Sequence, residues 1–167
     1  MPKVTRRSFV QGVVAATGLG AAETRKLRVL VLCTGNSARS QMTQAFLESF
    51  DRRLEVYSAG TKPAARVNPY AVRAMKEVGI DIANRIPKAV DQYVEQSFDF
   101  VFTVCDDADR NCPRFKGKVG KRVHIGFPDP AKATGTDDQI MAVFRQTRNN
   151  IQAKFSAYFQ ENMKGQL

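Results

Sequence analysis

The stretch VLVLCTGNSARS, residues 29–40, constrains the fold more than any other part of the chain. Its first four residues are apolar and are typical of a buried strand, and a helical pattern begins at Gln41. Cys33 stands where the strand ends, and Arg39 and Ser40 stand where the helix begins. A short loop between a strand and a helix points successive backbone N–H groups into one concavity, and the helix dipole adds positive potential there. The sequence therefore predicts a loop that binds a tetrahedral oxyanion in front of a cysteine.

Three side chains in this stretch suit oxyanion chemistry. The planar guanidinium of Arg39 can close the ring of donors and bind two oxyanion oxygens at once. A thiol at a helix N-terminus beside a guanidinium has its pKa lowered, so we expect Cys33 to be a nucleophile whose thiolate accepts a hydrogen bond from Ser40. The alternative is a buried cysteine that ends a strand, beside a solvated arginine. The predicted oxyanion-binding residues are Thr34, Gly35, Asn36, Ser37, Ala38, Arg39 and Ser40.

Residues 1–24 are expected to be a targeting segment, and residues 25–167 the single folded domain, which is long enough to bury one core. The segment contains Arg6-Arg7, followed by an apolar and small-residue stretch from Phe9 to Ala22. This pattern resembles a twin-arginine export signal and is too short to predict a membrane span. The alternative is a disordered or loosely helical basic tail.

The charge of the chain favours an anionic ligand. The net charge is +10, of which +3 falls in residues 1–22. A basic surface suits anionic substrates, but it also fits nucleic acid or a membrane surface. The densest group of bases, five within residues 114–122, is typical of a solvated mobile loop. We therefore expect no nucleic-acid partner.

Strand-like and helix-like segments alternate from Leu27 onward, which is typical of a parallel α/β fold. We expect a four-stranded parallel sheet flanked by helices. Val78 is expected on the apolar face of the helix that follows Asn68-Pro69. After the first strand, the predicted strands are 54–58, 98–104 and 122–125, and the predicted helices are 41–50, one from Asn68-Pro69 to about Gly79, a short piece at 92–96, and a last helix from Thr136-Asp137.

Two further cysteines, Cys105 and Cys112, flank the loop that follows the third predicted strand. The carboxyl ends of parallel strands share one edge of a sheet, so this pair can approach Cys33. Their six-residue spacer does not match zinc-ligand spacing, and we expect no metal site. Two interpretations remain open from the residues alone. Cys105 and Cys112 are either a small buried residue and an exposed loop thiol, or a relay that carries oxidation away from Cys33.

The last predicted strand contains a histidine and is followed by an acid. Displacement of an oxygen from an oxyanion needs a proton donor, and Asp129-Pro130 stands on a loop at the same sheet edge. Taken alone, Asp-Pro is only a turn signal. His124, the one histidine of the chain, lies on the strand and is expected to be structural rather than catalytic.

The loop CTGNSARSQM resembles the phosphate-binding loop of the low-molecular-weight tyrosine phosphatase superfamily, and within it the thioredoxin-coupled arsenate reductases. The segment VCDDADRNCP resembles the part of those reductases that holds their second and third redox cysteines, a pair that ordinary phosphatases of the superfamily lack. Asp129 matches the superfamily's general acid. Phosphatases often have aromatic residues directly after that Asp-Pro, whereas here Ala131-Lys132-Ala133 follows, which suits a small inorganic ion.

The resemblance implies reduction of arsenate to arsenite with Cys33, Arg39, Cys105, Cys112 and Asp129 as catalytic residues. Cys33 attacks arsenate, Cys105 then attacks the Cys33 sulfur and releases arsenite, and Cys112 resolves the disulfide to Cys105–Cys112. A thioredoxin-like protein would be the external reductant, with no bound cofactor and with phosphate as a weak competitor of arsenate. Some relatives bind potassium beside the loop, but Gln44 and Lys88 at the matching positions predict that the lysine ammonium replaces the cation.

Two alternatives to the reductase remain at this point: a low-molecular-weight protein tyrosine phosphatase, or a redox-responsive oxyanion-binding protein without turnover. The chain is expected to be a monomer. The twin-arginine pattern favours export to the periplasm by the twin-arginine machinery, and the alternative is a cytoplasmic enzyme. Export would conflict with the chemistry, since exported compartments are generally kept oxidising.

Overall fold

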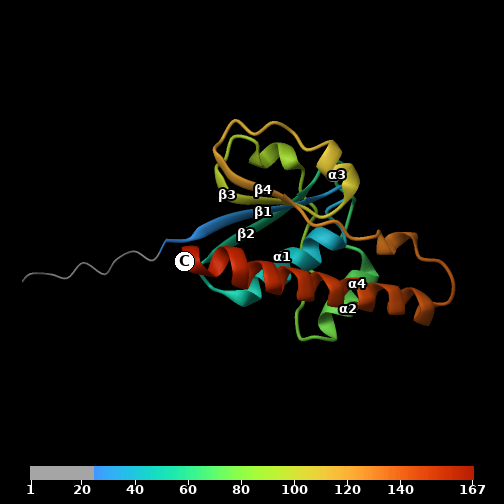
Figure 1. The fold of residues 1–167 in the computed structure, drawn as a ribbon. Helices are drawn as coiled ribbons and strands as arrows, with labels where there is room; N and C mark the ends of the chain where they lie inside the picture. The colour runs from blue at the N-terminus through green and yellow to red at the C-terminus, as the bar shows by residue number, and fades with distance from the viewer. Residues whose placement is uncertain (1–24) are drawn as a thin grey trace, which may run out of the picture.

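The computed structural model describes residues 25–167, so the predicted targeting segment at 1–24 lies outside the described residues. Four parallel strands form one sheet in the order β2-β1-β3-β4 (Figure 1). This confirms the predicted four-stranded parallel sheet. The strands are β1 (Leu27–Cys33), β2 (Leu54–Gly60), β3 (Phe98–Thr103) and β4 (Val119–His124).

Helices cover both faces of the sheet. Helices α1, α2 and α4 lie on one face, and α3 lies on the other together with the short helix η1 (Figure 1). None of the helices in residues 25–167 is both long and apolar enough to cross a membrane. The helices are α1 (Arg39–Phe50), α2 (Pro69–Lys76), η1 (Val90–Tyr93), α3 (Asp106–Arg110), η2 (Pro130–Lys132), α4 (Asp137–Tyr158), η3 (Phe159–Met163) and η4 (Lys164–Gln166).

The second helix begins as the sequence predicts and ends earlier. The Asn68 side chain accepts a hydrogen bond from the backbone N–H of Tyr70 at 2.9 Å and so caps the helix, with proline at its first position. Helix α2 ends at Lys76, and Gly79 adopts a positive φ of 80° in the turn that follows. Val78 therefore lies beyond the helix and is 41% exposed, so its predicted place on the apolar face is wrong.

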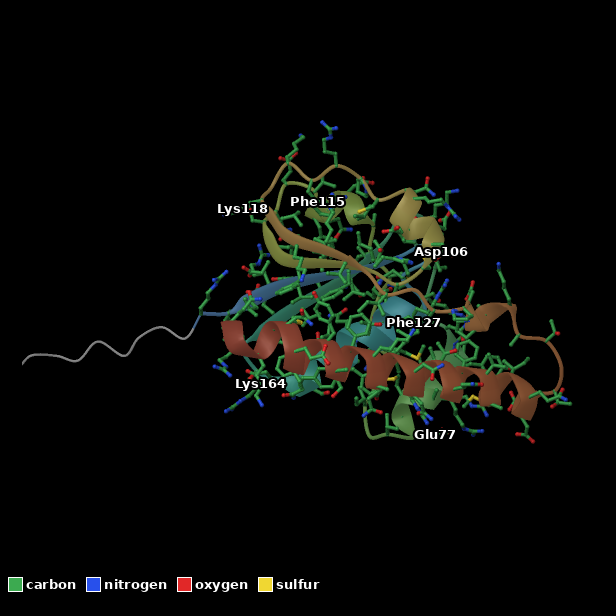
Figure 2. All side chains as sticks on the ribbon, viewed as in Figure 1. Glu77, Asp106, Phe115, Lys118, Phe127 and Lys164 are labelled. Carbon is green, nitrogen blue, oxygen red and sulfur yellow. The ribbon has the colours of Figure 1, made fainter. Side chains whose placement is uncertain are left out.

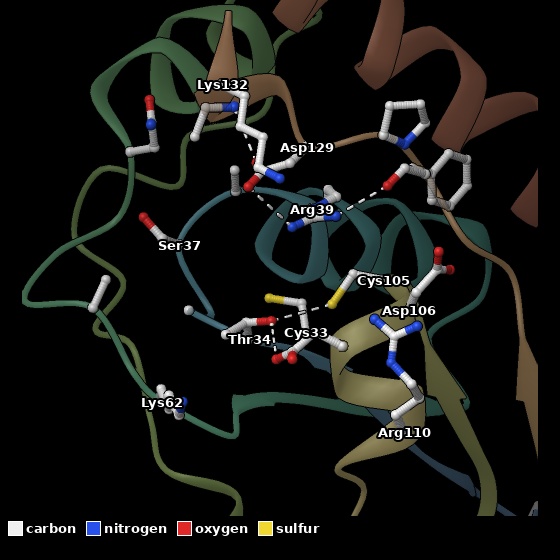
Figure 3. Close-up of a pocket in the computed structure, with 18 residues that line it drawn as sticks. Cys33, Thr34, Ser37, Arg39, Lys62, Cys105, Asp106, Arg110, Asp129 and Lys132 are labelled. Carbon is white, nitrogen blue, oxygen red and sulfur yellow. Dashed lines mark hydrogen bonds and ion pairs between the residues drawn. The ribbon is translucent and has the colours of Figure 1, made fainter.

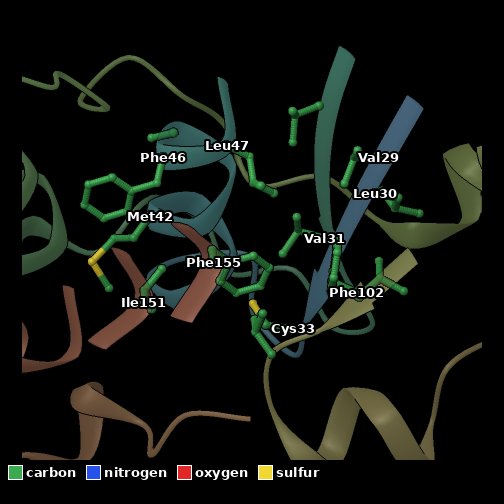
Figure 4. Packing of buried hydrophobic residues seen from close by; sticks show 14 of the residues in the cluster. Val29, Leu30, Val31, Cys33, Met42, Phe46, Leu47, Phe102, Ile151 and Phe155 are labelled. Carbon is green, nitrogen blue, oxygen red and sulfur yellow. The ribbon is translucent and has the colours of Figure 1, made fainter. Parts of the chain in front are cut away.

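The main core lies between the sheet and the pair α1 and α4 (Figure 4). Phe102 on β3 packs against Phe155 of α4 with ring centroids 5.1 Å apart, and Met42 and Phe46 of α1 are buried beside them. Burial of each such side chain contributes about 1.5–3 kcal/mol. Strand β1 has neighbours on both sides and no exposed surface from Val29 to Leu32, so it is a rigid support for the loop that follows it.

All four strands point their carboxyl ends toward one end of the molecule. Figure 2 shows Asp106 and Phe127 at this end and Lys118, which precedes β4, at the opposite end. The chain leaves β1 toward β2 on one side, while β3 lies on the other side, so the crevice between β1 and β3 is a topological switch point. Ligands of open α/β sheets bind in such crevices.

Candidate active site

The loop between β1 and α1 has its carbonyl groups tied to a neighbouring segment. Four backbone N–H groups from residues 61–68 bond these carbonyls from outside, so the N–H groups of the loop are left to face the other side. Ala38 caps α1 with no side-chain hydrogen bond and the first turn holds no acid, which leaves the positive end of the helix open. The four bonds are Thr61 to Cys33 (3.2 Å), Lys62 to Thr34 (2.8 Å), Ala64 to Gly35 (2.9 Å) and Asn68 to Ser37 (2.8 Å).

Asn36 fixes the shape of the loop from within the protein. It has a positive φ of 48° and is fully buried. Its amide group donates to the hydroxyls of Ser40 (2.9 Å) and Ser58 (2.8 Å), and its carbonyl oxygen accepts from the backbone N–H of Lys88 (2.9 Å). The side chains of Asn36 and Ser40 therefore support the loop from behind, although both residues were predicted to bind the oxyanion directly.

A cavity of about 730 Å³ opens over the loop (Figure 3). Five of the seven predicted oxyanion-binding residues line it, and so do Cys33, Cys105 and Asp129; Asn36, Ser40 and Cys112 do not. Ala131 and Lys132, which follow Asp129-Pro130, line it as expected for a small inorganic ion. The lining also contains residues that were not predicted to belong to the site, two of them cations: Lys62, Ala64, Asn68, Asp106, Asp107, Arg110, Phe127 and Pro128.

Cys33 lies at the floor of this cavity and is nearly buried. Its sulfur lies 2.8 Å from the Ser40 hydroxyl and accepts the backbone N–H of Asn36 at 3.0 Å. Burial raises the pKa of the Cys33 thiol above its ordinary value, and the hydrogen bonds from Ser40 and Asn36 oppose this rise only in part. The predicted lowering of the Cys33 pKa is therefore wrong for the loop without an anion, because the loss of water outweighs the donors.

Arg39 and Asp129 lie beside each other in the lining of the cavity. The Arg39 guanidinium donates to the backbone carbonyl of Phe127 at 3.0 Å, and its other nitrogen lies 3.5 Å from Asp129 Oδ2. The second oxygen of Asp129 accepts the N–H of Ala131 at 3.0 Å, which holds the carboxyl group at the start of η2. The cation and the proposed acid are thus both oriented toward the space above Cys33 (Figure 3).

Strand register brings Cys105 to the same cavity. Leu32 of β1 pairs with Thr103 of β3, and the N–H of Val104 donates to the carbonyl of Leu32 at 2.9 Å, so the residues that follow the two strands are neighbours. Cys105 is buried, with its sulfur 3.4 Å from the Thr34 hydroxyl. The Cys33 and Cys105 side chains both point into the space below Arg39 (Figure 3).

Cys112 follows α3 and lines a separate, smaller cavity of about 230 Å³, together with Arg122 and His124. It is half-buried, and this burial raises the pKa of its thiol while Arg122 opposes the rise. All three cysteines are free thiols in the structure. The structure thus groups Cys33 with Cys105 and separates Cys112 from them.

His124 and the predicted cation position have defined partners. His124 contacts Thr103, Asp106 and Asp109 and lines no part of the main cavity. The Lys88 backbone, not its ammonium, makes the hydrogen bond to the loop, and burial lowers the pKa of the ammonium. Within residues 25–167 no group of three or more His, Cys, Asp or Glu side chains is placed to hold a metal ion.

The additional lining residues come from segments with little signal in the sequence. Lys62, Ala64 and Asn68 reach the cavity because segment 61–68 bonds the loop carbonyls. Arg110 lies on α3, which the sequence analysis treated as loop. The signal available was the three acidic residues after Cys105, since acids are favoured in the first turn of a helix.

Residues 28–166 match the model of the low-molecular-weight phosphotyrosine protein phosphatase family. Proteins named arsenate reductase from Halalkalibacterium halodurans and Bacillus subtilis are each 44% identical to this chain, over 78% and 74% of it and 93% and 88% of their own lengths. A solved structure described as an arsenate reductase in the phosphate-binding state has a TM-score of 0.67 and 26% identity, and covers 81% of this chain and 98% of its own. Wzb of Vibrio vulnificus with benzylphosphonate, at 17% identity and a TM-score of 0.65 over 81% of this chain and 98% of its own, shares the fold. This chain therefore belongs to the low-molecular-weight phosphotyrosine protein phosphatase family.

Proposed function

We propose that this chain is an arsenate reductase that converts arsenate to arsenite. The observation that carries the proposal is a second free thiol, Cys105, in the same cavity as Cys33. A phosphatase needs only one thiol there, because water completes its reaction. The relatives named arsenate reductase, 44% identical over most of the chain, support the same activity.

The first step is attack of the Cys33 thiolate on arsenic. The loop N–H groups and the Arg39 guanidinium bind the arsenate oxygens, and the cations on the cavity wall favour a dianion. Asp129 gives a proton to the departing oxygen, which leaves as water, and a covalent bond joins the Cys33 sulfur to arsenic. Phosphate has the same shape and charge and would compete for the same donors.

The second step passes two electrons to arsenic. The Cys105 thiolate attacks the Cys33 sulfur, the sulfur–arsenic bond breaks, and its electron pair stays on arsenic, which leaves as arsenite. The two cysteines are oxidised to a disulfide as arsenic is reduced from the +5 to the +3 state. The β1–β3 register and the cavity that both thiols line support this attack.

The third step moves the oxidation to Cys112 and then to a thioredoxin-like donor. Helix α3 separates Cys105 from Cys112, and its five residues rise about 7.5 Å, whereas a disulfide needs Cα atoms about 4.4–6.8 Å apart. Resolution therefore requires α3 to unwind. No bound cofactor takes part in this scheme.

The test is an arsenate reduction assay with thioredoxin, thioredoxin reductase and NADPH. Cys33→Ser should abolish turnover without unfolding the chain, because the serine hydroxyl is scarcely ionised near neutral pH. Cys112→Ser should permit a single turnover and stop at a Cys33–Cys105 disulfide, which mass mapping identifies. Arsenite from the Cys33→Ser variant, or repeated turnover by Cys112→Ser with thioredoxin, would refute the scheme.

A phosphatase is the second candidate, since the family model carries that name. Ala131 and Lys132 line the cavity directly after Asp129-Pro130, the place where phosphatases often have aromatic residues, and the one aromatic side chain in the lining, Phe127, precedes that turn. Hydrolysis of a phosphate ester that survives loss of both Cys105 and Cys112, without arsenate reduction, would favour the phosphatase. A reversible disulfide with neither activity would leave a redox-responsive oxyanion-binding protein.

The site of action is a further part of the proposal. Arg6-Arg7 and the apolar stretch behind them support export by the twin-arginine machinery, which carries folded chains. An exported enzyme would need a membrane-linked thiol donor in an oxidising compartment. Cell fractionation and sequencing of the mature N-terminus test this, and a chain found only in the cytoplasm with its original N-terminus would refute export.

A further inference from the structure

Three carboxylates of α3 attach it to three different parts of the fold. Asp107 accepts the Thr34 hydroxyl of the loop at 2.9 Å. Asp109 accepts the hydroxyl of Thr103 on β3 at 2.8 Å, and Asp106 lies 3.1 Å from Nε2 of His124 on β4. The helix has only five residues, so these contacts and the buried Ala108 hold it in place. They must loosen before Cys112 can reach Cys105.

The protonation state of His124 sets how many of these contacts can be hydrogen-bonded at the same time. Its Nδ1 lies 2.9 Å from the Thr103 hydroxyl, its Nε2 faces Asp106, and the same Thr103 hydroxyl bonds Asp109. These three contacts require three hydrogens, and ionised carboxylates supply none. Thr103 supplies one, a neutral imidazole supplies one, and an imidazolium supplies two. All three contacts are therefore satisfied only when His124 carries both of its protons.

We infer that His124 is a positioning residue for the exchange between Cys105 and Cys112: as an imidazolium it holds α3 in place, and when it loses a proton it releases one carboxylate so that α3 unwinds more readily. The inference rests on the proposed function and adds its control by pH. Histidine is the side chain that changes charge between about pH 5 and 8. The charged and titratable groups that face His124 are Asp106 and Asp109 of α3, with Cys112 and Arg122 in the adjoining cavity.

The exchange itself balances without an added oxidant. The Cys112 thiolate attacks the Cys105 sulfur, the Cys33–Cys105 bond breaks, and Cys33 leaves as a thiolate that takes up the proton lost by Cys112. His124 makes no hydrogen bond to any of these sulfurs and acts through its contacts with α3. Asp106 is 78% exposed, so water competes for the contact, and its loss should change the rate of opening by about two- to fivefold.

The experiment isolates the opening of α3 from arsenate chemistry. The Cys33→Ser chain keeps Cys105 and Cys112, and diamide oxidises this pair to a disulfide, whose rate is followed by mass spectrometry from about pH 5.5 to 8. His124→Gln in the same background keeps a side chain of similar reach that does not titrate. The rate rises with pH in both chains as the thiols ionise, so the ratio of the two rates is the readout.

We expect the ratio of the rate with His124 to the rate with the H124Q substitution to rise about two- to fivefold across the pH range. Hydrogen exchange of the amides at 106–112 should show the same step, and D106N should diminish it. Asp91→Asn, an exposed acid on η1, is the matched control and should leave the step unchanged. A rate ratio that stays constant with pH, together with protection factors at 106–112 (exchange rates corrected for their intrinsic pH dependence) that also stay constant, would overturn the inference. Because no arsenate or thioredoxin is present, failure of the reductase proposal would leave this result unaffected.

Discussion

Replacement of Ser40 by alanine tests how the loop makes a nucleophile of a buried thiol. The Ser40 hydroxyl accepts the amide of Asn36 at 2.9 Å, so its own hydrogen is free to point at the Cys33 sulfur 2.8 Å away. A hydrogen bond to a charged group contributes about 1.5–3 kcal/mol, and each 1.36 kcal/mol is a factor of about ten in an equilibrium. Loss of this bond should therefore raise the Cys33 pKa further and reduce the thiolate fraction about ten- to hundredfold.

The rate of thiol exchange falls by less than the thiolate fraction. A more basic thiolate is a better nucleophile, and a Brønsted coefficient of about 0.4–0.5 offsets nearly half of the loss on a logarithmic scale. We expect Ser40→Ala to slow the reaction of Cys33 with a small disulfide near neutral pH by about four- to fifteenfold. The substitution also removes an acceptor from the buried Asn36 amide, which should lower the free energy of unfolding by about 1–3 kcal/mol.

The assay uses 2,2′-dithiodipyridine near pH 7 on a chain in which Cys105 and Cys112 are serine, so that Cys33 is its one thiol. Ser37→Ala is the matched control, because the Ser37 hydroxyl donates to the carbonyl of Arg66 and makes no bond to Cys33. Urea unfolding confirms that each variant is folded under the assay conditions. An equal rate for Ser40→Ala and the control would refute the role assigned to Ser40.

Three further predictions address the loop, the acid and the helix pair. A Cβ on Gly60 would overlap the backbone carbonyl of Thr34 in the loop, so Gly60→Ala should weaken phosphate binding measured by calorimetry, whereas Gly165→Ala, with open space around it, should not. Asp129→Asn should slow arsenate reduction by about 10²–10⁴-fold while phosphate still binds. The hydrogen bond from Arg145 lowers the pKa of Glu77 to about 2. The ionised Glu77 therefore stabilises the fold above the ordinary pKa of a glutamate, and this stabilisation is lost as the pH falls toward 2. The free energy of unfolding, measured in urea, should therefore fall less between about pH 5 and 2.5 in Glu77→Gln than in the unsubstituted chain.

The strand, the loop and the first helix were predictable because each is specified by nearby residues. The apolar run before Cys33 can only be a buried strand in a chain of this kind, and the alternation of strands and helices sets a parallel sheet. The carboxyl-edge rule then gives the common location of Cys33, Cys105 and Asp129 without any knowledge of side-chain contacts. Local patterns and one topological rule were sufficient for the centre of the site.

The parts that were not predicted depend on contacts distant in sequence. Helix α3 is short and polar, with Ala108 as its one buried residue, and it is held mainly by Thr34, Thr103 and His124, so no apolar periodicity indicates it. Strand β4 begins at Val119, three residues earlier than expected. Its first residues are basic and largely exposed, and they form a strand because they pair with β3. The pKa of Cys33 depends on how completely the folded loop excludes water from the thiol. That degree of burial depends on the folded structure and could not be predicted from the sequence.

One loop can support either a phosphatase or a reductase, and the position of the second thiol separates the two. In both proposed reactions a thiolate takes an oxyanion into a covalent bond, and we expect Arg39 to bind the oxygens and Asp129 to protonate the departing one. The outcome then depends on whether water or a sulfur reaches the adduct first. Cys105 stands within contact of Thr34, a residue of the loop itself, and needs no movement of α3 to enter the cavity. In the proposed scheme only the final transfer to Cys112 requires α3 to unwind, so we expect the contacts of this helix to govern regeneration of the enzyme and not the reduction of arsenate.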